Sequence, residues 1–162
     1  MNSQFSHAPS LNLDPSRKLL IIGCGGHSKV VTEVAESLGF LDISYFDSSL
    51  GKNSFLHRKV HSKIHEKYTG YFFVAIGDNF SREQVYNDFS TSHVGADSPI
   101  LIHPSSIFSS SSSIGFGSII MPLCVINANT SIGNGVIVNT SSSLDHDSIM
   151  NDFSSIAPGV NV

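Results

Sequence analysis

The chain has 162 residues, of which 40% are hydrophobic and 14% charged, and a formal net charge of −4. This length accommodates one domain or two small ones, and the acidic balance argues against nucleic acid as a partner. No apolar run reaches the roughly 18 residues that span a bilayer, so membrane insertion is not expected. The two cysteines, Cys24 and Cys124, suggest no disulfide framework, which fits a cytoplasmic location.

The N-terminal part alternates between predicted strands and helices. Residues 1–17 are polar, lack the basic start and apolar stretch of a signal peptide, and are expected to be a disordered tail. An apolar run at 18–23 predicts a buried strand. Apolar residues at helical spacing predict a helix over 29–38, which Gly39 ends.

Two more strands are predicted at 43–47 and 71–77, and a helix at 81–89 that Asp78 or Ser81 would cap. The polar stretch between these strands is expected to be irregular from residue 48 to residue 70. This order of elements predicts a small α/β domain with a parallel sheet, which we place at residues 18–98.

From residue 102 onward every sixth residue is apolar, and a small or compact side chain follows four positions later. Neither a helix nor a Ser-rich disordered tail has this pattern, whereas a parallel β-helix of hexapeptide repeats does. Three hexapeptides, about 18 residues, form one triangular rung, so residues 99–162 supply a little over three rungs. The apolar set is Ile102, Phe108, Ile114, Ile120, Ile126, Ile132, Val138, Leu144, Met150, Ile156 and Val162, and the compact set is Ser106, Ser112, Ser118, Cys124, Thr130, Val136, Ser142, Ser148, Ser154 and Val160.

A glycine-rich turn at residues 23–28 joins the first strand to the first helix. Such a turn can bring backbone N–H groups close to a phosphate at the helix N-terminus. Asp47 ends the second strand, where a ribose hydroxyl would be read, and the turn at 75–79 lies on the same sheet edge. Because Ser28 replaces the third glycine of the dinucleotide motif, a full NAD site is not indicated. A tight turn without a ligand is the alternative.

A histidine between two carboxylates marks the second candidate site, Asp145-His146-Asp147. Since Leu144 points into the coil, these three residues are expected at a corner, facing outward. Neighbouring carboxylates keep the pKa of a histidine near or above neutrality, so that it can accept a proton from an amine or hydroxyl. The alternative is a histidine that is merely solvated.

Other reactive residue types carry weaker signals. His57, His61 and His65 recur every four residues, as metal ligands on a helix would, but no Cys or Glu cluster completes a site. We therefore expect a polar loop there and no metal. His103 is expected to be structural at a β-helix corner. Cys24 adjoins a helix N-terminus that could lower its pKa, yet it has no visible base and is interpreted as a packing residue.

With both parts in view, the chain from Lys18 to Val162 resembles the sialic acid O-acetyltransferase and UDP-4-amino-sugar N-acetyltransferase family of hexapeptide-repeat acyltransferases. The motifs that carry the resemblance are the glycine turn with His27, Ala75-Ile-Gly-Asp-Asn79, Ile119-Ile-Met-Pro122, Val125-Ile-Asn-Ala128, Val136-Ile-Val-Asn-Thr140 and Asp145-His-Asp147. The resemblance implies an α/β N-terminal Rossmann-like domain that holds a nucleotide-sugar. It also implies a following left-handed parallel β-helix, which trimerises and binds acetyl-CoA between neighbouring subunits.

The resemblance further implies roles for individual residues. His146 would be the general base, Asp147 would orient it, and Asn139 would hold the acceptor amine. A backbone N–H would stabilise the oxyanion that forms when the amine attacks the thioester. The residues expected to lie at the nucleotide-sugar are Gly25, Gly26, His27, Asp47, Ser48, Gly77 and Asn79.

Several departures from the family pattern bear on activity. Ser48 stands where the family often has a second carboxylate, and Ser155 stands where a histidine contacts acetyl-CoA. Met150-Asn151 replaces the usual Ile-Gly. The family continues for several rungs beyond the position of Val162, so we expect either a fragment or a truncated form with poor catalysis.

The leading hypothesis is an acetyl-CoA-dependent N-acetyltransferase that acts on a UDP-linked 4-amino-sugar for glycan biosynthesis. Sialic acid O-acetylation is the alternative within the class, because an amine and a hydroxyl use the same base. A non-catalytic trimeric sugar-nucleotide-binding protein is a second alternative, and an NAD-dependent oxidoreductase rests on the glycine turn alone. A homotrimer is expected because residues 99–162 contain no Lys or Arg and only Asp145, Asp147 and Asp152 as carboxylates.

Overall fold

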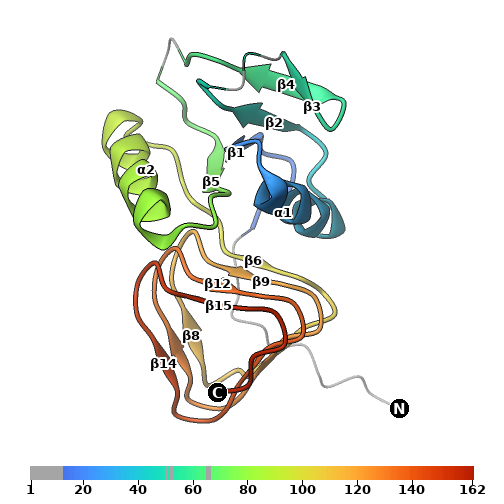
Figure 1. Ribbon diagram of the computed structural model, residues 1–162, viewed down its shortest axis with the longest axis vertical. Helices are drawn as coiled ribbons and strands as arrows, with labels where there is room; N and C mark the ends of the chain where they lie inside the picture. The colour runs from blue at the N-terminus through green and yellow to red at the C-terminus, as the bar shows by residue number, and fades with distance from the viewer. Residues whose placement is uncertain (1–12, 50, 52, 65–66) are drawn as a thin grey trace.

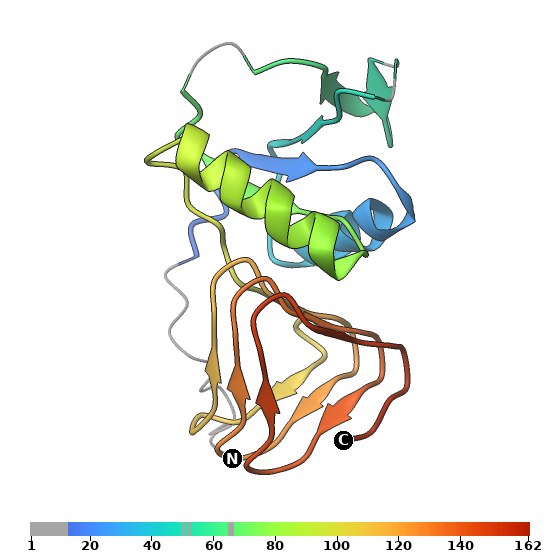
Figure 2. The ribbon, with the colours of Figure 1, turned by 60° about the vertical axis from the view of Figure 1, so that its left-hand side comes forward.

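This computed structural model describes residues 13–49, 51, 53–64 and 67–162. They form an α/β domain that lies over one face of a three-sided coil (Figures 1 and 2). No helix among them is both long and apolar enough to cross a membrane.

The α/β domain is a sheet with one helix on each face. Its strand order is β3-β4-β2-β1-β5, parallel except for the antiparallel β3–β4 pair. The elements are β1 (Leu19–Ile22), α1 (Gly26–Ser37), β2 (Ile43–Phe46), β3 (Ser54–Phe55), β4 (Arg58–His61), β5 (Tyr71–Val74) and α2 (Asn79–Ser92).

The central strand β1 is buried along its whole length because both faces are covered. Its alternate side chains point to opposite faces. Leu19 and Ile21 pack in the cluster that contains α1, and Leu20 and Ile22 pack in the cluster that contains Phe89 of α2. The predicted strands and helices therefore exist, with shifted ends. The structure also selects Asp78 as the cap of α2, since its carboxylate accepts from the Ser81 amide at 2.9 Å.

The prediction of an irregular loop at residues 48–70 is wrong for the described residues in its middle, which form the β3–β4 hairpin. Leu56 and His57 have φ values of 47° and 59°, the left-handed conformation that a two-residue hairpin turn needs. Val60 is buried and pairs with Tyr45 of β2. An edge hairpin with so few apolar contacts leaves little pattern in the sequence. His61 lies on β4, and His65 lies outside the described residues.

The prediction of a disordered tail at residues 1–17 is wrong for residues 13–17. Residues 1–12 lie outside the described part of the chain. The Arg17 guanidinium stacks 4.0 Å from the centre of the Tyr71 ring and pairs with the Asp97 carboxylate at 2.8 Å. Leu13 packs against the main core cluster. These contacts order the segment although its own composition is polar.

The C-terminal half is the predicted left-handed β-helix, with three parallel sheets as its faces. One face holds β6 (Leu101–Ile102), β9 (Ile119–Ile120), β12 (Ile137–Val138) and β15 (Ser155–Ile156), the second β7 (Ile107–Phe108), β10 (Val125–Ile126) and β13 (Ser143–Leu144), and the third β8 (Ser113–Ile114), β11 (Ser131–Ile132) and β14 (Ile149–Met150). The sixfold apolar set fills the interior. Its members are buried except for Ile114 and Ile156, which are half-buried, and Val162, which is 59% exposed.

The compact set connects the rungs at their corners. The Ser118 hydroxyl donates to the Gly133 carbonyl at 2.8 Å and accepts from the Val136 amide at 2.9 Å. Ser112 repeats the same two contacts one hexapeptide earlier. Backbone groups that turn away from the sheets at a corner would otherwise be buried without partners, which explains why this position takes small polar side chains.

Replacing Ser118 with alanine is expected to lower the free energy of unfolding by about 1–3 kcal/mol, because two buried backbone groups lose their partner. Urea denaturation at fixed protein concentration measures the change. Ser110→Ala, at an exposed position of the same coil, is the control and should stay within about 0.5 kcal/mol of the wild type. Equal effects of the two substitutions would contradict this role of the corner hydroxyls.

The α/β domain covers the face that contains β6, β9, β12 and β15. Leu101, Ile119 and Ile137 point outward from the coil, yet they are buried because they belong to the same core cluster as α1. Ile107 and Ile149, two of the outward residues of the other two faces, are 65% and 76% exposed. The two parts thus share one continuous core across a single face of the coil.

Arg82 of α2 stabilises the contact between the α/β domain and the coil through charge-assisted hydrogen bonds. Its side chain is 1% exposed. Nε donates to the Gly135 carbonyl and Nη2 to the Phe153 carbonyl, each at 2.8 Å, while Nη1 donates to the carbonyls of Ile76 and Gly77 at 3.0 Å. One guanidinium therefore ties the sheet edge of the α/β domain to two successive rungs of the coil.

Candidate active site

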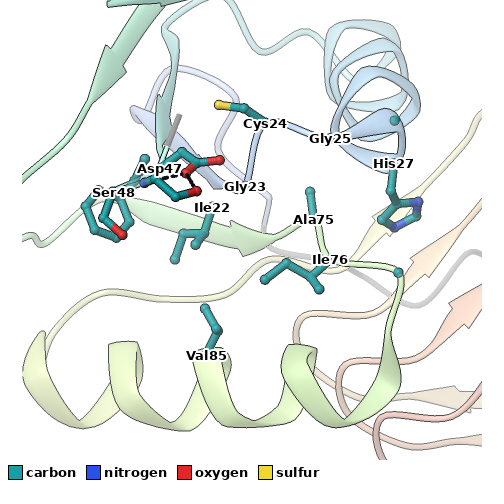
Figure 3. A pocket seen from close by; sticks show the side chains of 14 residues that line it. Ile22, Gly23, Cys24, Gly25, His27, Asp47, Ser48, Ala75, Ile76 and Val85 are labelled. Atoms are coloured by element: carbon teal, nitrogen blue, oxygen red, sulfur yellow. Dashed lines mark hydrogen bonds between the residues drawn. The ribbon is translucent and has the colours of Figure 1, made fainter. Parts of the chain in front are cut away.

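A cavity of about 450 Å³ opens at the carboxyl ends of β1, β2 and β5 (Figure 3). This is the edge where open α/β sheets place their ligands. The residues that line it are Ile22, Gly23, Cys24, Gly25, Gly26, His27, Phe46, Asp47, Ser48, Ser49, Ala75, Ile76, Gly77 and Val85. Six of the residues predicted for the nucleotide-sugar, Gly25, Gly26, His27, Asp47, Ser48 and Gly77, are thereby brought together, although they come from three separate segments.

The glycine turn leaves the N-terminus of α1 open toward this cavity. Gly25 occupies the N-cap position, and no side chain caps the helix. The first amide groups of the helix therefore lack a capping partner and carry the positive end of its dipole. Ser28 is buried, and its hydroxyl donates to the Gly23 carbonyl at 2.9 Å. The residue that breaks the dinucleotide motif thus closes the turn from inside, and the turn can still receive a phosphate.

His27 adds an unsatisfied polar atom to the same end of the cavity. Its Nε2 is buried and makes no hydrogen bond with any described residue. Burial, helped by the positive charge of Arg82, lowers the pKa of His27 to about 4. The imidazole is therefore neutral near pH 7, and its Nε2 is available to a ligand.

Asp47 lies at the opposite end of the cavity from His27 (Figure 3). Its Oδ1 accepts from the Ser49 amide at 2.9 Å and from the Ser49 hydroxyl at 2.8 Å. These bonds fix the carboxylate at the rim, next to Ser48. A carboxylate held in this way can accept hydrogen bonds from sugar hydroxyls.

Cys24 lines the cavity between these two ends, and its environment makes the thiol unreactive. Burial, with a smaller contribution from the charge of Asp47, raises the pKa of Cys24 to about 11. This outweighs the lowering that a nearby helix N-terminus could give. The structure thus agrees with a packing role, since Cys24 also contacts the main core cluster.

At pH 7.5, alkylation of Cys24 by iodoacetamide is expected to be about 100-fold slower than in the urea-unfolded chain, because the thiolate is the reacting form. The rate should rise about tenfold per pH unit up to pH 10. Mass spectrometry of the labelled peptide follows the reaction, and Cys24→Ser identifies the product. Labelling as fast as in the unfolded chain would contradict the raised pKa.

Asn79 links the cavity domain to the coil. Its Oδ1 accepts from Arg82 Nη2 at 2.8 Å and from the Ser155 hydroxyl at 2.9 Å. Ser155 is on β15, so this bond crosses from one part of the molecule to the other. Asn79 and Ser155, assigned by resemblance to different substrates, are therefore direct neighbours.

His146 occupies the corner between β13 and β14, and its side chain is 70% exposed. His146 Nδ1 lies 2.7 Å from Asp147 Oδ2. The pKa of His146 is raised by this hydrogen bond first, and then by the charges of Asp145 and Asp147. Both carboxylates have lowered pKa values, Asp145 through the His146 amide and Asp147 through the imidazole. An outward, basic imidazole oriented by a carboxylate can act as a general base.

Asn139 follows β12 at the neighbouring corner, before β13. It is half-buried, and its Oδ1 accepts from the Thr140 amide at 3.0 Å. The three predicted coil residues Asn139, His146 and Ser155 thus lie at different places around the triangle.

A single chain does not bring its candidate base to its cavity. The α/β domain covers the face that contains β6, β9, β12 and β15, whereas His146 lies at the corner where the other two faces meet. In a triangular coil this corner is the one opposite the covered face. The ribbon views show the coil extending away from the α/β domain accordingly (Figures 1 and 2).

Two other histidines singled out in the sequence, His103 and His57, lie at turns of the chain. His103 Nδ1 lies 2.8 Å from the Ser105 hydroxyl and accepts from the Ser105 amide, so it caps a corner of the coil. His57 is in the β3–β4 turn. Across the ranges that the structure describes, no three His, Cys, Asp or Glu side chains converge as metal ligands.

Arg82 was not singled out from the sequence. A lone arginine in the first turns of a polar helix is ordinarily a solvated residue. Its burial depends on carbonyl groups of residues more than fifty positions away, which no local pattern announces. The Asn79-x-x-Arg82 spacing, which brings the two side chains to one face of α2, is the only local hint.

An open α/β cavity joined to a left-handed β-helix with an exposed Asp-His-Asp corner defines a hexapeptide-repeat acyltransferase fold. Residues 18–89 match the family model described as the PglD N-terminal domain. The acetyltransferase domain of PglB from Neisseria gonorrhoeae, solved with acetyl coenzyme A, is 36% identical with a TM-score of 0.79, over 90% of this chain and 72% of that chain.

A variant of GDP-perosamine N-acetyl transferase from Caulobacter crescentus, solved with CoA and GDP-perosamine, is 29% identical with a TM-score of 0.81, over 89% of this chain and 70% of that chain. A curated GDP-perosamine N-acetyltransferase from Escherichia coli is 37% identical over 90 residues, which are 55% of this chain and 39% of that protein. The chain belongs to the family of 4-amino-sugar acetyltransferases with hexapeptide repeats, as its motifs predicted.

Proposed function

We propose that this protein transfers the acetyl group of acetyl-CoA to the amine of a nucleotide-linked amino sugar, with UDP as the nucleotide part. The observation that carries the proposal is the exposed His146 imidazole, held 2.7 Å from Asp147 in a member of this family. Solved relatives bind acetyl coenzyme A, or CoA with GDP-perosamine, which supports both substrate classes.

The proposed chemistry needs one base and no metal. The amine nitrogen attacks the thioester carbonyl carbon, a C–N bond forms, and the C–S bond breaks. His146 takes the proton that the nitrogen loses and returns it to the departing thiolate, which leaves as CoA. Asp147 holds the ring through Nδ1, so that Nε2 faces the amine, and Asn139 would hold the amine in line. Ser155 would contact the acetyl-CoA side.

At the other end of the substrate, the cavity is suited to a nucleoside diphosphate. The open N-terminus of α1 at Gly25 and Gly26 would receive a phosphate, and Asp47 with Ser48 would read hydroxyl groups. The neutral His27 offers its free Nε2 to the ligand, beside Gly77 and Asn79. Calorimetry with UDP and with GDP tests which nucleobase the cavity prefers. Tighter binding of GDP would overturn the UDP assignment and leave the transfer proposal standing.

A second copy of the chain would complete the site, since the base and the cavity lie on opposite sides of one coil. We therefore propose a homotrimer in which the His146 corner of one subunit meets the cavity of its neighbour. The uncharged outer faces, with exposed Ile107 and Ile149, favour such contacts. Light scattering measures the mass, and a monomer at micromolar concentration would contradict the proposal.

Mixed trimers give a sharper test of this arrangement. His146→Gln and Asp47→Asn are each expected to be inactive alone. Unfolded together and refolded as a mixture, they should regain activity, because some interfaces then pair an intact base with an intact cavity. No recovery, with trimers present, would contradict a site shared between subunits.

The direct test of function combines the protein with acetyl-CoA and a UDP-4-amino-sugar and follows the release of free thiol. Release that depends on the sugar, with an acetylated product by mass spectrometry, is expected. No release would reject the proposal, and release with sialic acid instead would favour O-acetylation. The names of the relatives favour an amine acceptor. We place the protein in the cytoplasm, consistent with its free cysteines.

A further inference from the structure

The corner that presents His146 rests on an equivalent corner one rung below. The pairing of β10 with β13 sets Val125 opposite Ser143 and Ile126 opposite Leu144. The next three residues of each strand, 127–129 and 145–147, therefore lie one above the other. Two backbone bonds at 3.0 Å fix the stack, from the Asn127 amide to the Leu144 carbonyl and from the Asp147 amide to the Ala128 carbonyl.

An asparagine of this lower corner lies beneath each carboxylate beside the histidine. Asn127 Nδ2 donates to Asp145 Oδ1 at 3.0 Å, and the same oxygen accepts from the His146 amide at 2.8 Å. Asn129 lies one rung below Asp147, the carboxylate that binds the imidazole, directly after the Ala128 carbonyl that accepts from the Asp147 amide. Asn129 and Asp147 also share a left-handed backbone, with φ values of 59° and 61°. Asn and Asp tolerate this conformation better than most residues.

The lower corner is itself anchored and brings no charge. The Asn129 amide donates to the Ser111 hydroxyl at 3.1 Å, one rung further down. Among the described residues, the titratable groups that face the imidazole are Asp145 and Asp147, and the strand above contributes the Val162 carbonyl, which accepts from the Asp145 amide. The neutral Asn127 amide therefore fixes Asp145 without cancelling its negative charge, and the residue beneath Asp147 is neutral as well.

We infer that Asn127 is a positioning residue for His146, which holds Asp145 as an ionised acceptor beside the imidazole, and that Asn129 supports Asp147 from the same lower corner. The inference rests on the proposed function for its catalytic meaning, but its geometry can be tested without turnover. Neither residue touches the substrate in this proposal. They act through the two carboxylates.

A second asparagine-under-aspartate pair in the same coil provides a matched control. The Asn134 backbone amide donates to Asp152 Oδ1 at 2.8 Å, and the side-chain Nδ2 of Asn134 donates to the same oxygen at 3.4 Å. The spacing is again one rung, but no histidine lies beside it. Substitutions at Asn134 remove this side-chain contact, and also the bond from the Phe116 amide to Asn134 Oδ1 at 3.0 Å, without reaching the imidazole.

The test is an NMR titration of the His146 ring in the full protein, with the resonance assigned by its loss in His146→Gln. Asn127→Ala frees Asp145 and should lower the titration midpoint of His146 by a few tenths of a pH unit. Asn127→Asp adds a third carboxylate and should raise it by about half a pH unit, as expected for one charge several ångströms away in water. Asn129→Ala, which removes the side chain beneath Asp147, should lower it as well.

In the acetyl-transfer assay, the acid limb of kcat/KM should move in the same directions. Asn127→Ala and Asn129→Ala should lower kcat about 3- to 10-fold while KM changes less than twofold. Asn134→Ala and Asn134→Asp should leave the His146 titration and the acid limb unchanged. Midpoints that move equally for Asn127 and Asn134 variants, or shift in one direction for both Asn127 variants, would overturn the inference. Shifted midpoints in a protein without transferase activity would instead reject the proposed function alone.

Discussion

Replacing His146 with glutamine is expected to lower kcat for acetyl transfer by about 10²- to 10⁴-fold, the usual contribution of a general base. In the wild type, kcat/KM should fall as the pH decreases, because protonation of His146 removes the base. The Asp147 hydrogen bond and the charges of Asp145 and Asp147 raise the pKa of His146 above its ordinary value of 6.5. The midpoint of this acid limb should therefore lie above pH 6.5, and Asp147→Asn should move it down.

Two observations separate this role from a loss of folding. His146→Gln should still bind the nucleotide-sugar, since the residues proposed to hold its nucleotide part belong to the cavity of the α/β domain and not to the His146 corner. His103→Gln, at another outward corner, should keep full activity because the His103 imidazole bonds the neighbouring Ser105 and has no proposed role in catalysis. A His146→Gln protein with more than a tenth of the wild-type kcat would contradict the assignment of the base.

Replacing Arg82 with methionine is expected to lower the free energy of unfolding by about 4 kcal/mol. The substitution keeps much of the apolar stem but removes the donors to Gly135, Phe153 and the β5 end, and carbonyls left buried without partners are costly. Arg82→Lys should recover only part of the loss, because one ammonium cannot reach acceptors on both sides. Urea denaturation at a fixed protein concentration measures these changes.

Arg58→Met is the matched control for Arg82. Arg58 pairs with Glu36 at 2.6 Å on a partly exposed surface, and such a pair contributes at most about 1 kcal/mol. An Arg82→Met protein as stable as Arg58→Met would show that the guanidinium does not fasten the two parts together.

Local sequence patterns predicted most of the fold because each pattern reports which side chains are buried. The sixfold recurrence from Ile102 reports which side chains enter the coil, and the apolar runs at 19–22 and 71–74 report strands covered on both faces. The β3–β4 hairpin was not predicted because Val60 is its one buried residue, and a single buried residue makes no pattern. The order of residues 13–17 was not predicted because it depends on contacts with Tyr71 and Asp97, which are distant in sequence. The domain boundary near residue 98 stays a prediction.

Part of the candidate site could likewise be predicted from the sequence, and part of it could not. The turn at 23–28 and the Asp-His-Asp corner could be found from sequence because each is a local segment whose residue types suggest its chemistry. The sequence could not indicate that Asn127 lies beneath Asp145, since that contact depends on the register of the coil. Nor could it place the cavity opposite the His146 corner, because the face that the α/β domain covers decides this.

The sequence by itself determined a parallel sheet with helices, a hexapeptide coil and an outward histidine between two carboxylates, because periodicity fixes which way a side chain points. Tertiary structure alone decided how these parts meet. Arg82 is buried by carbonyls from both parts, and Asn79 bonds to Ser155 across the contact. Long-range contacts of this kind follow from packing and satisfied hydrogen bonds in three dimensions, which no spacing along the chain records.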